Sequence, residues 1–271
     1  MTLRYSAEVG LALILLLMAA TEPSGRVELS PRLAAWKSEI EARGLRIILA
    51  RVYPDVPQDA DQRLAVARIL ADPAYAPQLR NAHAMTVNLE GYGRRASFIL
   101  LNMARYSEWE GYEEPMIAHE LGHVDLHTRG YRSPGIAPGE PVCEATHVGD
   151  MVQHILIRQE MKKRGIDYVP WMAGTLDPVI AILRRGGPAP NGRCDQLARL
   201  SMWLDASLGL TERDWPRLPE FLELMQQRFP ELAPVEASLQ ERLATLDVTR
   251  IPTYEGALKL AQRAASQTSS R

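Results

Sequence analysis

The chain has 271 residues, of which 46% are apolar and 24% charged, a globular composition that excludes a largely disordered or low-complexity protein. Its 33 acidic and 31 basic residues give a net charge of −2, so there is no basic excess to neutralise phosphates. With only 6% aromatic residues to stack on bases, the composition argues against a nucleic-acid partner.

The first predicted element is an uncharged apolar segment, residues 9–20, which follows Arg4. As a helix it would rise only about 18 Å, short of the roughly 30 Å hydrocarbon core of a membrane. That length is typical of the apolar region of a secretory signal. We therefore expect residues 1–24 to be a signal peptide that exports the chain to the periplasm or outside the cell. An uncleaved membrane tether and a buried helix are the alternatives.

The next part of the chain predicts a mixture of helices and strands. Ser30 as N-cap and Pro31 in the first turn indicate a helix over residues 31–43. Branched apolar residues indicate strands, and glycines between the last two of them indicate a hairpin. The further predicted elements are a strand over 45–52, a helix over 59–71, and strands over 84–89 and 96–103. The strand over 96–103 either offers a free edge to a substrate backbone or lies at the centre of a sheet.

The rest of the chain predicts helices. One runs from Pro115 to residue 128, with Pro115 in its first position and Gly130 just after its end. A loop over 131–139 and a long helix over 141–164 follow, and Gly165 ends that helix. Further helical stretches lie near 195–210, 216–229, 235–246 and 254–266. A small β-rich half followed by a mostly helical half predicts the α+β class.

Five of the six histidines fall between residues 119 and 154, and two of them form the motif His119-Glu120-Leu121-Gly122-His123. On a helix, His119 and His123 lie one turn apart on the same side, so both imidazoles can reach one metal ion. Glu120 lies about 100° round the helix, where it can take a proton from a metal-bound water. Gly122 removes a side chain near the metal and permits another segment to approach closely. The motif therefore predicts a Zn²⁺ site, and the alternative is an ordinary helix with two solvated histidines.

Catalytic zinc takes three protein ligands, so one more is needed. His127 lies a further turn up the helix, about 6 Å away in rise, which is too far for the same ion. A carboxylate from the next helix remains, and Glu144 and Glu140 are the candidates.

An HExxH motif followed by a glutamate on a downstream helix resembles the gluzincin metallopeptidases, which include thermolysin-like, HtpX-like and ImmA/IrrE-like proteins. Cys143-Glu144-Ala145 is similar to the ligand glutamate and the small residue after it in thermolysin-like enzymes. The resemblance implies Glu144 as the third ligand and a zincin-like fold, with the motif helix next to a small sheet. The resemblance covers roughly residues 84–160, and we predict a catalytic domain over residues 25–165 and a helical region over 166–271.

The resemblance and the motif together predict a metalloendopeptidase, a hydrolase that cleaves a protein or peptide substrate with Zn²⁺ and with Glu120 as general base. The alternative is a non-catalytic zinc-binding or regulatory protein, exported or tethered to the membrane. A third possibility is a membrane-tethered interaction module that acts through residues 166–271.

Other polar residues near the motif have supporting roles in this prediction. His147 and His154 either stabilise the oxyanion of the reaction or support the ligands and the packing. Asp125 and Asp150 either orient a ligating imidazole or are solvated acids. Cys143 and Cys194 permit one disulfide in an exported chain, and two free thiols are the alternative.

Overall fold

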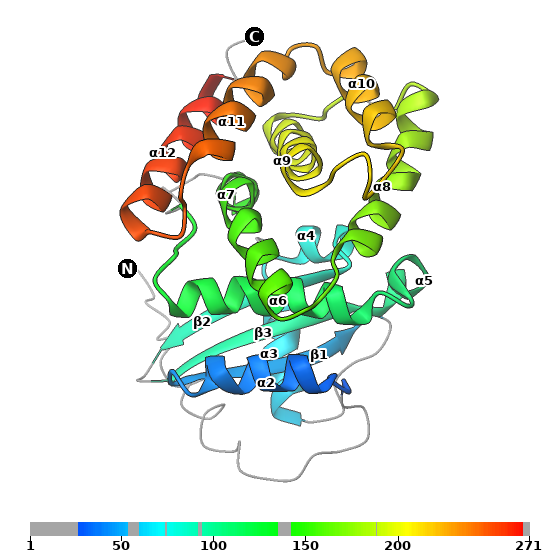
Figure 1. The fold of residues 1–271 in the computed structure, drawn as a ribbon. Coiled ribbons are helices and arrows are strands. Elements are labelled where there is room, and N and C mark those ends of the chain that lie inside the picture. The colour runs from blue at the N-terminus through cyan, green and yellow to red at the C-terminus, as the bar shows by residue number, and fades with distance from the viewer. Residues whose placement is uncertain are drawn as a thin grey trace, which may run out of the picture. The chain divides into compact units, whose positions relative to one another are not determined.

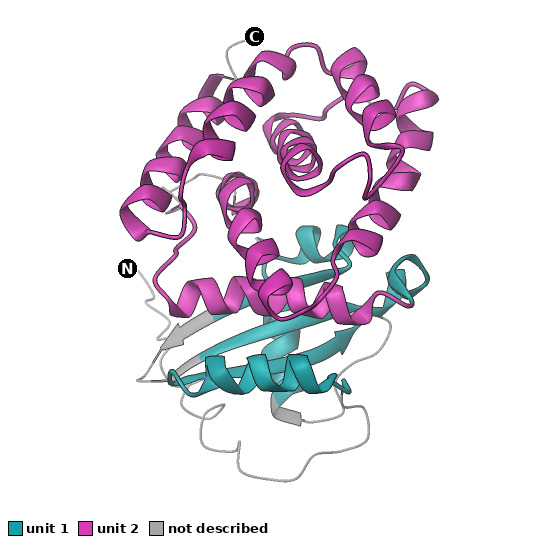
Figure 2. Cartoon of the chain, viewed as in Figure 1, with its two compact units in different colours: residues 1–110 teal, residues 111–271 magenta. Residues whose placement is uncertain are grey.

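The computed structural model describes residues 27–53, 60–73, 75–91, 94–134, 142–187 and 189–267. The described part is α+β, as predicted, and divides into two compact units, residues 1–110 and 111–271 (Figure 2). The predicted signal segment and the candidate ligand Glu140 lie outside the described residues, so those predictions stay predictions. Among the helices described, none combines the length and the apolar character needed to cross a membrane.

Unit 1, residues 1–110, contains a three-stranded mixed sheet in the order β1-β3-β2 (Figure 1). Its strands are β1 (Leu45–Val52), β2 (Ala84–Gly91) and β3 (Arg94–Asn102). The predicted hairpin is confirmed, because β2 and β3 pair antiparallel from Ala84 opposite Leu101 to Gly91 opposite Arg94. β1 pairs parallel to β3 on its other side. β3 is therefore the central strand, and the hypothesis that it offers a free edge to a substrate is wrong.

Short helices complete unit 1. Ser30 caps α2 as predicted, since its hydroxyl accepts a hydrogen bond from the Leu33 amide. The helices are α2 (Pro31–Glu41), α3 (Ala60–Ala71), α4 (Ala76–Asn81), the 3-10 turn η1 (Met103–Arg105) and α5 (Tyr106–Trp109). Side chains of β1, β3, α3 and α4 form one apolar core, which includes Ile48, Val66, Leu79 and Phe98.

Unit 2, residues 111–271, is helical in its described part (Figure 1). Its helices are α6 (Glu113–Thr128), α7 (Val142–Lys163), α8 (Val169–Arg184), α9 (Arg193–Gly209), α10 (Leu218–Arg228), α11 (Ala233–Thr245) and α12 (Ile251–Gln267). α7 packs against α6, α9 and α12. Because of this packing, the motif helix and the C-terminal helices share one unit. The division between the two compact units lies after Glu110, and the predicted catalytic domain over residues 25–165 stays a prediction.

Two local features fix α6 and α7. α6 begins at Glu113, so Pro115 is its third residue rather than its first. At its other end Gly130 has a φ of +90°, and the amide of Tyr131 donates to the Leu126 carbonyl, which is the glycine-ended cap that the sequence predicted. Cys143 in the first turn of α7 forms a disulfide with Cys194 in the first turn of α9, so the alternative of two free thiols is wrong.

Candidate metal centre

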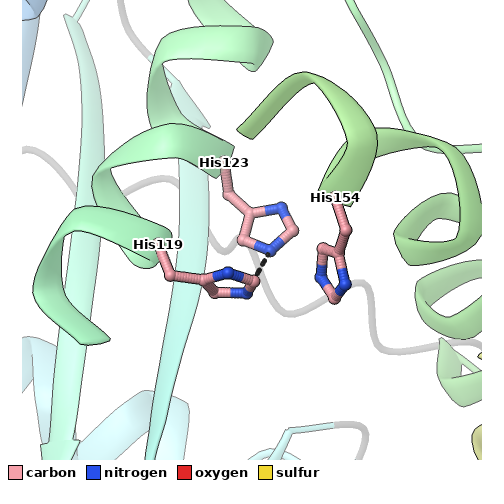
Figure 3. A group of neighbouring side chains, drawn as sticks. All are labelled: His119, His123 and His154. Carbon is pink, nitrogen blue, oxygen red and sulfur yellow. Dashed lines mark hydrogen bonds between the residues drawn. The ribbon is translucent and has the colours of Figure 1, made fainter. Parts of the chain in front are cut away.

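His119 and His123 project from the same side of α6, and their rings converge (Figure 3). Their Nε2 atoms are 3.3 Å apart, and their ring centroids are 4.9 Å apart. Two nitrogens bound to one zinc ion with tetrahedral geometry, at about 2.0–2.1 Å each, lie roughly 3.3–3.4 Å apart. The pair therefore already has the spacing that a shared metal ion requires.

A third histidine from α7, His154, completes the cluster (Figure 3). Its ring centroid lies 4.5 Å from that of His119 and 5.4 Å from that of His123. One ligand atom of each of the three residues lies within 4.8 Å of the others. Three imidazoles from two helices are a donor set that zinc accepts, with a fourth position left for water or substrate.

A close helix crossing brings His154 to this place. A Cβ atom on Gly122 would lie only 2.7 Å from Cγ2 of Ile157, so only glycine permits this approach of α6 to α7. His123 follows Gly122 directly, and His154 lies one turn before Ile157 on α7. The predicted close approach of another segment at Gly122 is thus confirmed, and the crossing point determines which residue of α7 faces the motif.

Glu144 is not in this cluster. It precedes His154 by ten residues on α7, about 15 Å of helix rise, and its carboxylate pairs with the Arg193 guanidinium next to the disulfide. The sequence prediction took the first acid of the next helix as the ligand, but the two helices cross three turns later. The histidine density around residues 119–154 was the signal that pointed to His154.

Hydrogen bonds at Nδ1 orient two of the three rings. Nδ1 of His154 lies 2.6 Å from a carboxylate oxygen of Asp205 on α9, and Nδ1 of His123 lies 2.9 Å from Oε1 of Gln153. A donated Nδ1–H leaves Nε2 as the nitrogen with a free lone pair. Metal-binding histidines commonly have such partners, because they fix the tautomer and the ring orientation.

The surrounding charges favour a cation site. The second carboxylate oxygen of Asp205 pairs with Arg158, and a carboxylate oxygen of Asp150 lies 3.7 Å from Nε2 of His154. Although burial alone would raise the pKa of Asp205, His154 and Arg158 hold that pKa well below its ordinary value. Asp205 is therefore ionised across the range in which the protein would work. No local signal in the sequence pointed to Asp205, because this residue lies 51 positions after His154 on another helix.

The histidines themselves differ in protonation. Burial lowers the pKa of His119 well below its ordinary value, and the neighbouring His154 and His123 lower it further. Its ring is therefore neutral at pH 7, as a ligand must be. Burial would also lower the pKa of His154, but the carboxylates of Asp205 and Asp150 raise it above the ordinary value.

Glu120 and Trp171 complete the surroundings of His119. Glu120 is buried on α6 with 8% of its surface exposed, so the motif glutamate is in a shielded environment. The Trp171 ring from α8 lies 5.2 Å from the His119 ring, centroid to centroid. Its indole N–H is buried and finds no hydrogen-bond acceptor within the described part of the chain.

The remaining sequence candidates lie near the centre without joining it. His147 is 3.9 Å from a carboxylate oxygen of Asp150, and neither residue belongs to the three-histidine group. Asp125 is buried and pairs with Arg129, so the interpretation as a solvated acid is wrong.

Comparison of the chain with protein-family models, with curated proteins and with solved structures gave no significant match.

Proposed function

We propose that this protein is a zinc-dependent peptidase whose metal is held by His119, His123 and His154. The observation that carries the proposal is the convergence of three imidazoles, two of them from an HExxH motif and the third from the helix that crosses it. Catalytic zinc sites use three protein ligands, and three histidines are one of the established sets. In this proposal His154 replaces the predicted carboxylate ligand Glu144, which has Arg193 as its partner instead.

When bound, zinc would lower the pKa of a coordinated water to about 7 and polarise a substrate carbonyl. Glu120, next to His119 in the motif, would accept the proton of the attacking water and return it to the leaving amine. Asp205 would hold His154 and balance the charge brought by the ion, because its carboxylate accepts a hydrogen bond from that ring.

We extend the proposal to the family and the location. A mixed sheet followed in the chain by an HExxH helix supports a zincin-like fold, whereas a histidine as third ligand departs from the gluzincin plan, in which that ligand is a glutamate. The disulfide between Cys143 and Cys194 supports export, because disulfides persist in oxidising compartments. The substrate would then be a protein or peptide outside the cytoplasm.

Zinc content and turnover of matched variants test this function. We expect His154→Ala to lose more than about 100-fold in zinc affinity, since it removes a ligand rather than a residue behind one. Glu144→Gln, on the same helix, should keep the zinc affinity of the parent. Equal zinc binding by His154→Ala and the parent would contradict the assignment of His154.

Glu120→Gln separates binding from chemistry. This variant should bind zinc in the parent stoichiometry and lose the cleavage of an unfolded protein substrate such as casein, because the amide cannot accept the proton. A parent that binds zinc one to one but cleaves no peptide substrate would instead favour the non-catalytic zinc-binding protein.

A further inference from the structure

A chain of hydrogen bonds connects the metal centre to the last described helix, α12. From Nδ1 of His123 it runs 2.9 Å to Oε1 of Gln153, and from Nε2 of Gln153 it runs 3.1 Å to the hydroxyl of Tyr254. The Tyr254 hydroxyl then reaches the backbone carbonyl of Arg132 at 2.9 Å. The Gln153 and Tyr254 side chains are buried, with 4% and 1% of their surface exposed, so water does not compete for these bonds.

The backbone carbonyl of Arg132, where this series of hydrogen bonds ends, determines the direction of every bond in it. A backbone carbonyl only accepts, so Tyr254 donates to Arg132. The hydroxyl oxygen of Tyr254 is then free to accept from the amide group of Gln153. That amide group also donates to the Ser133 hydroxyl at 3.2 Å, so both of its N–H donors are used.

The orientation of the Gln153 amide in turn sets the tautomer of His123. Oε1 of Gln153 only accepts hydrogen bonds, so Nδ1 of His123 must carry the proton. The lone pair of the neutral ring then lies on Nε2, the atom that is 3.3 Å from Nε2 of His119. A neutral imidazole in the other tautomer would present an N–H to the metal position, where it cannot bind.

We propose that Gln153 and Tyr254 are positioning residues that hold His123 in its metal-binding tautomer, so that packing of α12 on α7 tunes the affinity of the metal centre. The proposal rests on the proposed function for the identity of the metal. It assigns the C-terminal helix a part in the site, although Tyr254 lies 101 residues after Gln153 in the chain.

The chain offers a matched control for this proposal. Tyr131 is also buried, and its ring centroid lies 5.1 Å from that of Tyr254. Its hydroxyl donates to a different backbone carbonyl, that of Thr249, and not to Gln153. Tyr254→Phe and Tyr131→Phe therefore each remove one hydroxyl from this pair of contacting tyrosines. Only Tyr254→Phe breaks the series of hydrogen bonds to His123.

The test measures the zinc dissociation constant by chelator competition for the full chain and for both variants. We expect Tyr254→Phe to weaken zinc binding about 10-fold to 100-fold, as losses behind a ligating histidine do, and Tyr131→Phe to change it less than about twofold. Gln153→Met, which removes the amide at similar size, should weaken zinc binding at least as much as Tyr254→Phe. The double variant Gln153→Met/Tyr254→Phe should bind zinc no more weakly than Gln153→Met alone, because both changes break the same series of hydrogen bonds.

Nitrogen NMR of the metal-free parent supplies a readout that a merely structural role would not move. The His123 ring should carry its proton on Nδ1, and Gln153→Met should redistribute it toward Nε2. Parent-like zinc affinity in Tyr254→Phe, an equal loss in Tyr131→Phe, or a parent ring protonated on Nε2 would each overturn the proposal. If the parent binds no zinc, the proposed function fails, while the tautomer measurement still decides the role of Gln153.

Discussion

The two units of this chain use their buried polar side chains differently. Among the described residues of unit 1, the buried polar residues are Ser97 and Asn102, which bond within the sheet and its connections. In unit 2 the buried polar residues include Glu120, Gln153 and Arg158, which lie in or beside the histidine cluster. Buried polar groups are costly without partners, and Gln153 and Arg158 find theirs in His123 and Asp205, at the convergent imidazoles.

The largest effect on stability is expected in unit 1. Asn102 donates to the carbonyls of Leu79 and Ala82 at 2.8 and 3.0 Å and accepts from the Ala104 amide at 3.2 Å. Asn102→Ala leaves these groups without that partner, and we expect it to lower the free energy of unfolding by about 3 kcal/mol. Urea unfolding measures this loss.

The zinc affinity of Asn102→Ala tests whether a loss of buried hydrogen bonds in unit 1 leaves the histidine cluster of unit 2 unchanged. The folded Asn102→Ala variant should bind zinc like the parent, because its lost bonds are all in unit 1. Asn81→Ala, an exposed position, is the control and should change stability by less than about 0.5 kcal/mol. A loss of zinc binding in folded Asn102→Ala would break the distinction between the two units.

An intermediate effect is expected at the helix crossing in unit 2. Gly122→Ala places a Cβ against Ile157, and such overpacking costs about 1–3 kcal/mol. Because the crossing sets the position of His154, this variant should lose zinc affinity as well as stability. The loss of zinc affinity should be partly restored by adding Ile157→Ala, which removes the two Cγ atoms that the new Cβ would meet at 2.7 and 2.9 Å. Unchanged zinc binding in Gly122→Ala would show that the crossing does not set the ligand geometry.

The smallest effect concerns a buried acid of unit 2 away from the histidines. Burial raises the pKa of Glu236 above its ordinary value, although the Ser207 hydroxyl donates to it at 2.8 Å. Its protonated form is the one the fold favours, so its contribution to stability is complete below its unfolded pKa and is lost as pH rises through the folded pKa.

Glu236→Gln should remove this dependence. The variant should gain stability relative to the parent as pH rises from 4 to 8, and thermal melts across that range measure the difference. If the difference in stability between the two proteins stays constant with pH, ionisation of Glu236 does not destabilise the fold.

Local signals in the sequence predicted much of this structure. The strand over 45–52 has the predicted bounds, and Ser30 and Gly130 cap their helices as expected. α8 was missed because Pro170, Gly174 and Pro178 suggested a break, whereas tertiary packing of Ile180 and its neighbours outweighs those residues. Such local patterns act within one or two turns of chain, and a single sequence displays them directly.

The site was predictable only as far as one helix extends. The motif placed His119 and His123 together, because their relation is a property of α6 alone. The partners from other helices depend on where helices cross, which is decided by side chains at the contact, such as Gly122 against Ile157. The sequence therefore named His154 only as a supporting residue, and it gave no indication of Asp205 or Tyr254.

The disulfide gives the fold a tolerance to chain breakage. Cys143 and Cys194 enclose α8 and the exposed segment that joins it to α9, within a sequence separation of 51. A protease that cut this segment would produce two fragments still covalently attached to each other. One would hold the three histidines and the other Asp205 and Tyr254, and the disulfide would keep the two fragments covalently joined until a reductant cleaved it.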